Sequence, residues 1–362
     1  MDDSWRRSRG DGGGPAPHPG GDGRAGGSGA VRHRDRRRRR QLDHGVDRRG
    51  GGGRAQGRSR AVRRRFPRGT EPVPPSIALL HGRRYPQHRE TAREDEAFRK
   101  GKDAYEEAAR LAGWNFERLD VPLEGGTFEA FLHLPAGEGP FPVVVTAGGV
   151  DFSKTENGML FEEFLAPAGT AMVTFDNAGF GDSKDWPADR PDTDRLYSAV
   201  VDVLLTDQRI DAERIGAMGQ SYGGNSAARL AFTDERVKAV ASVCGPVHES
   251  MVIGIPFVEN LPPQPRATLS ARYNVPVEDT ERIAQLLGEA SLVNQGLVGE
   301  VRTDTPILAF SNADDPFAPV EDLERLAASS TAGEVKVIEG HGHCPLIRDR
   351  NPVVADWFER VL

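Results

Sequence analysis

The stretch IGAMGQSYGG, residues 215–224, decides the fold of this chain. An apolar run leads into a Gly-x-Ser-x-Gly sequence, and a helix-forming run follows it. This strand–turn–helix context places the central serine on a tight turn that lifts its hydroxyl clear of a sheet. Gly219 and Gly223 allow the backbone to pass close to that turn, because glycine carries no Cβ. We therefore predict that Ser221 is a nucleophile and that the backbone N–H of Tyr222 faces the oxyanion formed during its reaction.

Short apolar runs alternate with helical patterns on both sides of this stretch. The predicted strands cover residues 116–121, 127–134, 141–147, 171–175, 214–218, 237–243, 306–310 and 334–338, and the predicted helices cover 93–111, 160–165, 196–205, 225–232, 320–328 and 353–362. Buried strands that alternate with helices indicate an α/β fold, with a mostly parallel sheet covered on both faces. Residues from about 246 to 300 interrupt the alternation. We expect this insertion to form a helical cap over the carboxyl edge of the sheet, where it would shape a substrate pocket.

A serine nucleophile needs a base, and the base needs a carboxylate that orients it. In this arrangement the acid and then the histidine follow the serine along the chain. The turn SNADDPFAP, which follows the strand at 306–310, offers Asp315, with Asp314 as the alternative. The turn EGHGHC, which follows the last strand, offers His343, with His341 as the alternative. We take Asp315 and His343 as the predicted pair, because the first lies in a rigid Asp-Pro turn and the second follows a flexible glycine.

A second oxyanion donor is expected from the loop that follows the strand at 141–147. The loop begins Gly-Gly-Val-Asp at residue 148, and its two glycines let the backbone approach a substrate closely. The N–H of Gly149 or of Val150 would then donate to the oxyanion. A simple Gly-Gly turn is the competing interpretation.

The first 65 residues differ from the rest of the chain. They contain nineteen Arg and seven Asp with no Lys or Glu, which gives a net charge of +12, and since the whole chain carries −7 the remainder carries −19. An acidic catalytic portion argues against nucleic acid as its substrate. We divide the chain into a disordered Arg/Gly-rich segment at 1–65, a linker and helix at 66–112, and an α/β domain at 113–362 that holds the cap insertion.

Three interpretations of residues 1–65 compete. An Arg/Gly-rich tail can bind nucleic acid, but Trp5 is the one aromatic side chain there that could stack on bases. A solvated tail without a function of its own is the second, because the segment has too few apolar side chains to fold. The third is an artefact of translating GC-rich DNA from a wrong start or frame. The composition favours the last two, and we assign the segment no function.

The cysteines and the apolar runs bear on where the protein is found. Cys244 and Cys344 are the two cysteines of the chain, too few for a disulfide framework, and we expect both to behave as small apolar side chains. No apolar run approaches the roughly 18 residues of a membrane-spanning helix. No apolar segment follows the N-terminal arginines, as a secretory signal would require. We therefore expect no membrane association and a cytoplasmic location.

Residues from about 90 to 362 resemble the α/β-hydrolase superfamily. The resemblance rests on Gly148-Gly149-Val150-Asp151, Asp176-x-x-Gly179-x-Gly181-x-Ser183, Gly219-x-Ser221-x-Gly223, Asp315-Pro316 and Gly342-His343. The helix before the sheet and the large insertion are similar to the branch of the FrsA-like esterases and 2,6-dihydroxypseudooxynicotine hydrolases. The resemblance implies an α/β-hydrolase fold and a serine hydrolase that uses no metal and no other cofactor. Relatives of this branch have a longer helical region before residue 90, and this departure favours the artefact interpretation of residues 1–65.

The same resemblance implies two reactions, because the branch contains esterases and also C–C bond hydrolases of β-diketone-like chains. We expect a carboxylesterase-like enzyme that forms an acyl-enzyme, with retro-Claisen cleavage of a β-dicarbonyl as the alternative. For the alternative the resemblance implies an auxiliary acid near the substrate, and Glu249 is the candidate, although a solvated loop carboxylate competes with that role. A non-catalytic binding module on the same fold is the third hypothesis. The expected partner is a small acyl or β-dicarbonyl substrate, and the sequence leaves the oligomeric state open, a homodimer included.

Overall fold

A computed structural model of the protein describes residues 92–299 and 303–362. These residues belong to one compact unit, Phe66–Leu362. The predictions made for residues 1–65, and for the linker up to residue 91, lie outside the described residues.

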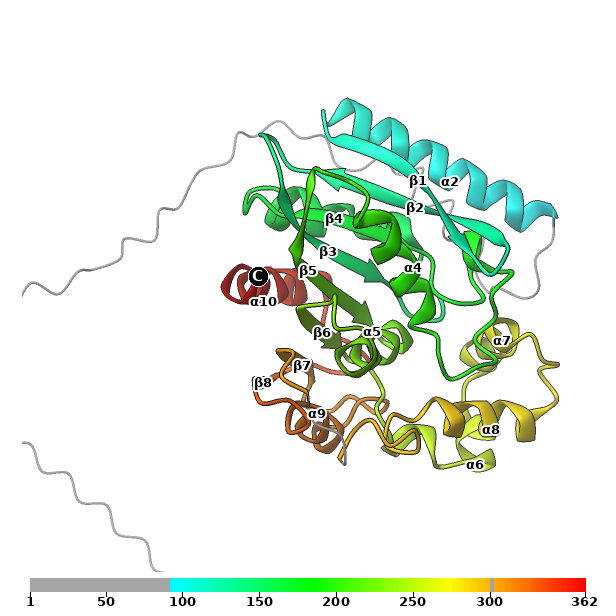
Figure 1. Cartoon of the computed structure of the whole chain (residues 1–362). Helices are drawn as coiled ribbons and strands as arrows, with labels where there is room; N and C mark the ends of the chain where they lie inside the picture. Colours follow the sequence, from blue (N-terminus) through cyan, green and yellow to red (C-terminus); the bar gives the residue numbers. More distant parts are fainter. Residues whose placement is uncertain (1–91, 300–302) are drawn as a thin grey trace, which may run out of the picture. The chain divides into compact units, whose positions relative to one another are not determined.

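In the described part of the chain, eight strands form one sheet in the order β1-β2-β4-β3-β5-β6-β7-β8 (Figure 1). The strands are β1 (Asn115–Leu123), β2 (Gly126–Leu134), β3 (Phe141–Ala147), β4 (Ala171–Phe175), β5 (Ile210–Gln220), β6 (Ala239–Val243), β7 (Ile307–Asn312) and β8 (Gly333–Ile338). β2 pairs antiparallel with both β1 and β4, and the remaining neighbours are parallel. This mostly parallel sheet confirms the fold predicted from the sequence, and each predicted strand is present.

Helices cover both faces of this sheet (Figure 1). One face packs against α4 (Arg195–Leu204), α5 (Tyr222–Thr233) and α9 (Val320–Ala327), and the other against α3 (Gly158–Leu160), the π-helical turn η2 (Phe161–Leu165) and α10 (Ile347–Val361). The side chains of β3 contribute to the hydrophobic cores on both faces of the sheet. Val143 and Val145 lie in the first core and Val144 in the second, because successive side chains of a strand point to opposite faces.

The first described helix, α2 (Ala92–Leu111), lies against the antiparallel end of the sheet. Tyr105 stacks on Phe131 of β2 with ring centroids 5.5 Å apart. Its hydroxyl lies 2.8 Å from Nε2 of the buried His133. Burial lowers the pKa of His133 to about 3, so this histidine is neutral and takes part in the core. The helix agrees closely with the one predicted at 93–111.

Two helices begin earlier than predicted. α5 begins at Tyr222, directly after Ser221, whereas the sequence placed its start at 225 because glycines precede that residue. The glycines occupy the first helical turn. α10 begins at Ile347, six residues before the predicted start, and Pro352 lies inside the helix. Proline lacks an N–H and usually stands at a helix start, which explains the late prediction.

Within the insertion between β6 and β7 the structure has four helical segments: the 3₁₀ turn η4 (Glu249–Met251), α6 (Ile255–Asn260), α7 (Pro263–Tyr273) and α8 (Thr280–Ala290). Figure 1 shows α6, α7 and α8 together, on the side toward which the central strands point. Asp279 caps α8, since its side chain accepts a hydrogen bond from the N–H of Arg282. The insertion thus lies at the edge of the sheet where the Ser221 turn is found, and we call these four segments the cap.

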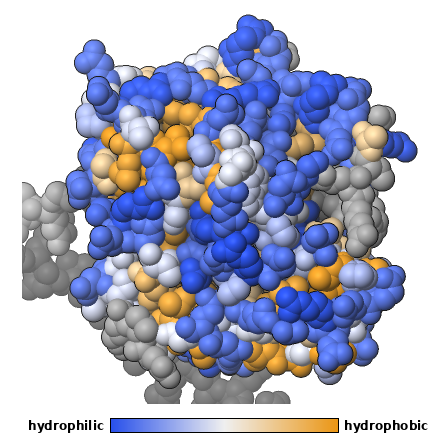
Figure 2. Space-filling model, turned by 45° about the vertical axis from the view of Figure 1, so that its right-hand side comes forward, coloured by the Kyte–Doolittle hydropathy of each residue, from blue (hydrophilic) through white to orange (hydrophobic). Residues whose placement is uncertain are grey.

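The face of the molecule drawn in Figure 2 is mainly polar. Hydrophilic residues predominate there and apolar residues form separate groups between them. Among the described helices, none has the length and apolar character that crossing a membrane requires.

Candidate active site

Ser221 lies on a tight turn that requires glycine at positions 219 and 223. Its φ and ψ angles are 55° and −128°, which is a rare conformation for a residue with a side chain. A Cβ on Gly219 would collide with the carbonyl of Gly223, and a Cβ on Gly223 would collide with the carbonyl of Gly148. The two glycines of the Gly-x-Ser-x-Gly sequence are therefore required by contact between backbones, as the sequence suggested.

His343 lies beside this serine. Its Nε2 atom is 2.7 Å from the hydroxyl oxygen of Ser221, although 122 residues separate the two positions. The imidazole also meets the ring of Phe317 edge-on, with centroids 4.8 Å apart. The ring of Phe317 in turn packs against that of Phe257 in the cap, with the ring centroids 5.8 Å apart. His343 therefore lies against Phe317, which in turn contacts Phe257 of the cap.

Asp315 holds the other side of the imidazole. Its two carboxylate oxygens are 2.9 and 3.1 Å from Nδ1 of His343. The carboxylate also accepts hydrogen bonds from Ser311 and from the backbone N–H groups of Phe317, Ala318 and Cys344. Burial alone would raise the pKa of Asp315, but the bonds from His343, Cys344 and Ser311 outweigh it and hold the pKa below its usual value. An ionised Asp315 favours the tautomer of His343 that carries its proton on Nδ1, and in this tautomer Nε2 can accept a hydrogen bond from Ser221.

The alternative residues form a pair of their own. His341 Nδ1 lies 2.7 Å from a carboxylate oxygen of Asp314, and their side chains are 97% and 52% exposed. The hydrogen bond that His341 donates to Asp314 raises the pKa of His341. The Ser221 hydroxyl contacts His343, so the structure brings Asp315 and His343, and not this exposed pair, to the serine.

The loop after β3 passes directly over Ser221. A Cβ on Gly149 would lie 2.8 Å from the Cβ of Ser221 and 3.1 Å from its hydroxyl oxygen, so the backbone of Gly149 borders Ser221. Within residues 92–299 and 303–362, no protein group accepts a hydrogen bond from the N–H of Tyr222, Gly149 or Val150. These three N–H groups remain available to an oxyanion bound at Ser221.

Glu249 lies elsewhere. Its carboxylate forms a 3.0 Å ion pair with Arg325 of α9, and its side chain is 49% exposed. Its backbone N–H donates to Asp322, which anchors the start of the cap. The structure therefore places the candidate auxiliary acid in a surface ion pair at the base of the cap, and gives it no contact with Ser221 or His343.

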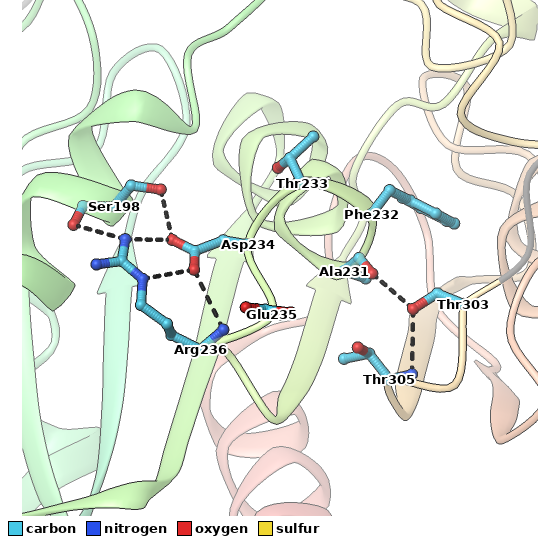
Figure 3. Close-up of a pocket in the computed structure, with 9 residues that line it drawn as sticks. All are labelled: Ser198, Ala231, Phe232, Thr233, Asp234, Glu235, Arg236, Thr303 and Thr305. Atoms are coloured by element: carbon cyan, nitrogen blue, oxygen red, sulfur yellow. Dashed lines mark hydrogen bonds and ion pairs between the residues drawn. The ribbon is translucent and has the colours of Figure 1, made fainter.

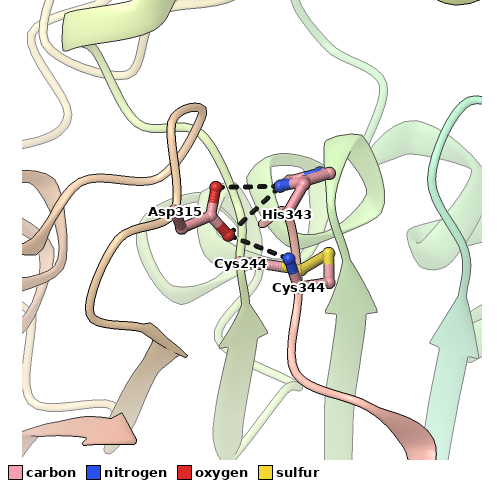
Figure 4. A group of neighbouring side chains, drawn as sticks. All are labelled: Cys244, Asp315, His343 and Cys344. Carbon is pink, nitrogen blue, oxygen red and sulfur yellow. Dashed lines mark hydrogen bonds and ion pairs between the residues drawn. A yellow bond between two sulfur atoms is a disulfide. The ribbon is translucent and has the colours of Figure 1, made fainter. Parts of the chain in front are cut away.

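Cys244 and Cys344 form a disulfide, which overturns the expectation of two free apolar side chains (Figure 4). Their Cα atoms are 5.1 Å apart across a sequence separation of 100 residues. Cys244 directly follows β6, and Cys344 directly follows His343. The parallel strands bring both residues to the same edge of the sheet, a proximity that two isolated cysteines in a sequence do not reveal.

The four side chains in Figure 4 gather the groups that usually bind metals, namely Cys244, Asp315, His343 and Cys344. Metal binding by cysteine uses the thiolate. The two sulfur atoms here are bonded to each other, and the His343 Nδ1 atom faces Asp315. The cluster therefore fits an orienting acid and base better than a metal centre.

A surface pocket of about 660 Å³ lies at the opposite edge of the sheet from Ser221, where β6 and β7 begin (Figure 3). It is lined by Ser198, Ala231, Phe232, Thr233, Asp234, Glu235, Arg236, Thr303 and Thr305. The polar groups there bond to one another: Arg236 pairs with Asp234 at 2.7 Å, and Ser198 donates to the same carboxylate. This pocket is separate from the serine site.

Sequence reasoning missed one side chain at the site, Arg272 of α7. It lies in the cap, yet its guanidinium bonds to the carbonyls of Val150 and Gly179. Gly179 belongs to the motif after β4 that the sequence singled out without a role. The partners are far apart in the chain, so no local pattern joins them.

Comparisons with known proteins point to one family. A family model described as "Esterase FrsA-like" matches residues 77–361. Esterase FrsA of Escherichia coli, in strains O1:K1 / APEC and K12, is 33% identical over 264 residues, which are 72% of this chain and 62% of the relative. The chain thus spans about three fifths of the length of these curated relatives.

Solved structures with the same fold are more distant in sequence. A crystal structure of 2,6-dihydroxy-pseudo-oxynicotine hydrolase is 23% identical with a TM-score of 0.67, and the match covers 79% of this chain and 78% of that one. A thermostable carboxylesterase cloned from a metagenomic library is 16% identical with a TM-score of 0.52, over 73% of this chain and 97% of that one. These likenesses show the α/β-hydrolase fold.

Proposed function

Because the chain belongs to the FrsA-like esterase family, we propose that it is a serine hydrolase that cleaves a carboxylic ester through Ser221, His343 and Asp315. The observation that carries the proposal is the continuous contact of the three side chains. His343 lies 2.7 Å from Ser221 through Nε2 and 2.9 Å from Asp315 through Nδ1. A nucleophile, a base and an orienting acid in this order are the elements of acyl transfer by serine.

The reaction begins when His343 removes the proton of the Ser221 hydroxyl and the oxygen attacks the ester carbonyl carbon. Asp315 keeps Nδ1 protonated and stabilises the imidazolium that forms. The carbonyl oxygen becomes negatively charged and accepts hydrogen bonds from the N–H of Tyr222 and from Gly149 or Val150. His343 then gives its proton to the departing alcohol. A water molecule, activated by the same histidine, attacks the acyl-enzyme and releases the acid.

The surroundings of the pair support a substrate with an apolar portion. Phe317 contacts His343, and Phe257 of the cap contacts Phe317. Apolar and aromatic walls with few polar groups are typical of small-molecule sites. We therefore infer a small ester whose acyl or alcohol part packs against these two rings. Ester hydrolysis is favoured over retro-Claisen cleavage because Glu249, the candidate acid for the second reaction, pairs with Arg325.

The experiment is fluorophosphonate labelling of the full chain, located by peptide mapping, with the hydrolysis of p-nitrophenyl butyrate followed in parallel. Wild type is expected to be labelled at Ser221 and to hydrolyse the ester. The Ser221→Ala variant is expected to lose the label and at least about 10³-fold of the turnover. Absence of labelling in the folded wild-type protein, or unchanged turnover in Ser221→Ala, would exclude the proposal.

A further inference from the structure

Arg272 connects the cap to the loop that borders Ser221. It is the penultimate residue of α7, and only 6% of it is exposed. Its Nε–H donates to the carbonyl of Val150 at 2.5 Å, and its Nη1–H donates to the carbonyl of Gly179 at 2.5 Å. The guanidinium also lies over the ring of Phe180, 4.1 Å from the centroid. One side chain of the cap thus contacts the loops that follow β3 and β4.

The backbone of α7 is held in the same place. The Arg272 carbonyl accepts a hydrogen bond from the N–H of Ala188 at 2.9 Å. A Cβ on Gly179 would collide with that carbonyl and would lie 2.9 Å from the Arg272 Cα. Gly179 has a φ of 72°, so both its conformation and its contact with α7 require glycine. The sequence motif after β4 therefore provides the surface on which Arg272 sits.

The loop after β3 is held at two carbonyls, those of Gly148 and Val150, on either side of Gly149. Asn177 donates to the carbonyl of Gly148 at 3.1 Å, and Arg272 donates to that of Val150. A trans peptide bond is planar and its C=O and N–H point in opposite directions. The Gly148 carbonyl and the Gly149 N–H belong to one peptide unit, so anchoring that carbonyl fixes the direction of the Gly149 N–H. The Val150 N–H belongs to the next peptide unit, which lies between this unit and the unit whose Val150 carbonyl is anchored.

We infer that Arg272 is a positioning residue of the oxyanion hole. When the cap is in place, Arg272 aligns the Gly149 and Val150 N–H groups over Ser221. The inference rests on the proposed function. Of the two anchors, Asn177 belongs to the core, and Arg272 belongs to the cap that covers the substrate. Displacement of the cap removes the Val150 anchor, so the oxyanion hole is complete only when the cap is in place. Small displacements of a donor lower turnover strongly, by about 10²-fold for roughly 1 Å.

The test compares Arg272→Met and Arg272→Lys with Arg282→Met, a matched control on α8 of the cap, whose guanidinium pairs with Glu289 at 3.4 Å. For Arg272→Met we expect kcat for p-nitrophenyl butyrate to fall about 10- to 100-fold with KM changed less than threefold. Arg272→Lys, which keeps the charge and can reach one carbonyl, is expected to be intermediate. Arg282→Met is expected to match wild type.

Inhibition separates positioning from a merely structural role. A trifluoromethyl ketone binds Ser221 as a tetrahedral oxyanion, whereas the matched methyl ketone binds as a neutral carbonyl compound. In Arg272→Met the Ki of the trifluoromethyl ketone should rise at least about tenfold, and that of the methyl ketone should stay within twofold. Equal weakening of both inhibitors, or wild-type kcat in Arg272→Met, would overturn the inference.

The outcome for Ser221→Ala keeps the two proposals distinct. Loss of activity in Ser221→Ala together with wild-type kinetics in Arg272→Met would remove only the role of Arg272. Retained activity in Ser221→Ala would remove the serine mechanism itself. Thermal unfolding of each variant shows that the fold is intact, and Arg272→Lys provides the measurement if Arg272→Met does not fold.

Discussion

His341 Nδ1 lies 2.7 Å from Asp314, so the two residues repeat, on the surface, the contact that His343 makes with Asp315. The pairs come from the same two loops and differ in burial. Asp315 is 3% exposed, whereas the Asp314 side chain is 52% exposed. An exposed pair is screened by water and contributes little. The protein therefore contains a catalytic candidate and its own matched control.

Asp315→Asn is expected to lower kcat/KM for p-nitrophenyl butyrate by about 10³- to 10⁴-fold, because an amide no longer holds the Nδ1 proton of His343. Asp314→Asn should stay within about twofold of wild type. Steady-state kinetics on both variants, with circular dichroism as a check of folding, measures the difference. A larger loss of kcat/KM in Asp314→Asn than in Asp315→Asn would instead identify Asp314 as the acid that orients the histidine.

Gly149→Ala is expected to lower kcat by about 10²-fold while the protein remains folded. The added methyl group would lie 2.8 Å from the Cβ of Ser221 and 3.1 Å from its hydroxyl oxygen, so the loop after β3 must move away from the nucleophile. Gly288→Ala is the control, because a Cβ at that position in α8 meets no atom within 4 Å. Equal kcat values for Gly149→Ala and Gly288→Ala would show that displacement of the loop after β3 does not affect turnover.

Removal of the disulfide is expected to destabilise the fold. A crosslink that closes a loop of 100 residues contributes about 4 to 5 kcal/mol by the entropy of the unfolded chain. Urea unfolding should show a loss of this order in Cys244→Ala/Cys344→Ala, and a similar loss in wild type treated with a thiol reductant. Thiol titration provides the check on the bond: the denatured, unreduced wild-type protein should release no free thiol, and release of two would contradict the disulfide.

Glu156→Gln is expected to stabilise the protein at alkaline pH and to leave it unchanged at acidic pH. Burial raises the pKa of Glu156 to about 7 from a usual value of 4.5. The folded state therefore favours the protonated carboxyl, and this contribution is full below pH 4.5 and is lost as the pH rises through 7. The shift corresponds to roughly 3 kcal/mol.

Urea unfolding at several pH values measures the effect. The stability of Glu156→Gln relative to wild type should increase by roughly 3 kcal/mol between pH 4 and pH 8. A neutral glutamine can still accept the hydrogen bond that Glu156 accepts from the N–H of Ser153. Glu163→Gln, at an exposed position of η2, is the control variant and should show no such increase. A constant difference across the pH range would disprove the raised pKa.

Local patterns predicted most of the fold. The inner strands β4, β6 and β7 are short apolar runs, and each was found close to its predicted position because burial on both faces leaves an unbroken apolar signature. The elbow was predictable for a similar reason, since Gly219, Ser221 and Gly223 meet within five residues and the turn demands glycine. Helix starts were less certain where Pro352 or glycines lie inside a helix.

The remaining features depend on contacts between distant residues. The sequence offered two acids and two histidines, and it is their burial and the contact of His343 with Ser221 that distinguish Asp315 and His343 from Asp314 and His341. Arg272 reaches Val150 across 122 residues, and the two cysteines meet across 100. No periodicity or motif encodes such a pairing, because each residue is ordinary in its own segment.

The Cys244–Cys344 bond closes a covalent ring that contains the cap, Asp315 and His343, while Ser221 and the Gly149 loop lie outside it. A protease that cuts one peptide bond of the cap therefore cannot separate His343 from Ser221. The two fragments stay joined through sulfur, and the nicked chain migrates as a single species until it is reduced. A cut in the cap therefore leaves Ser221, Asp315 and His343 within one covalently joined molecule.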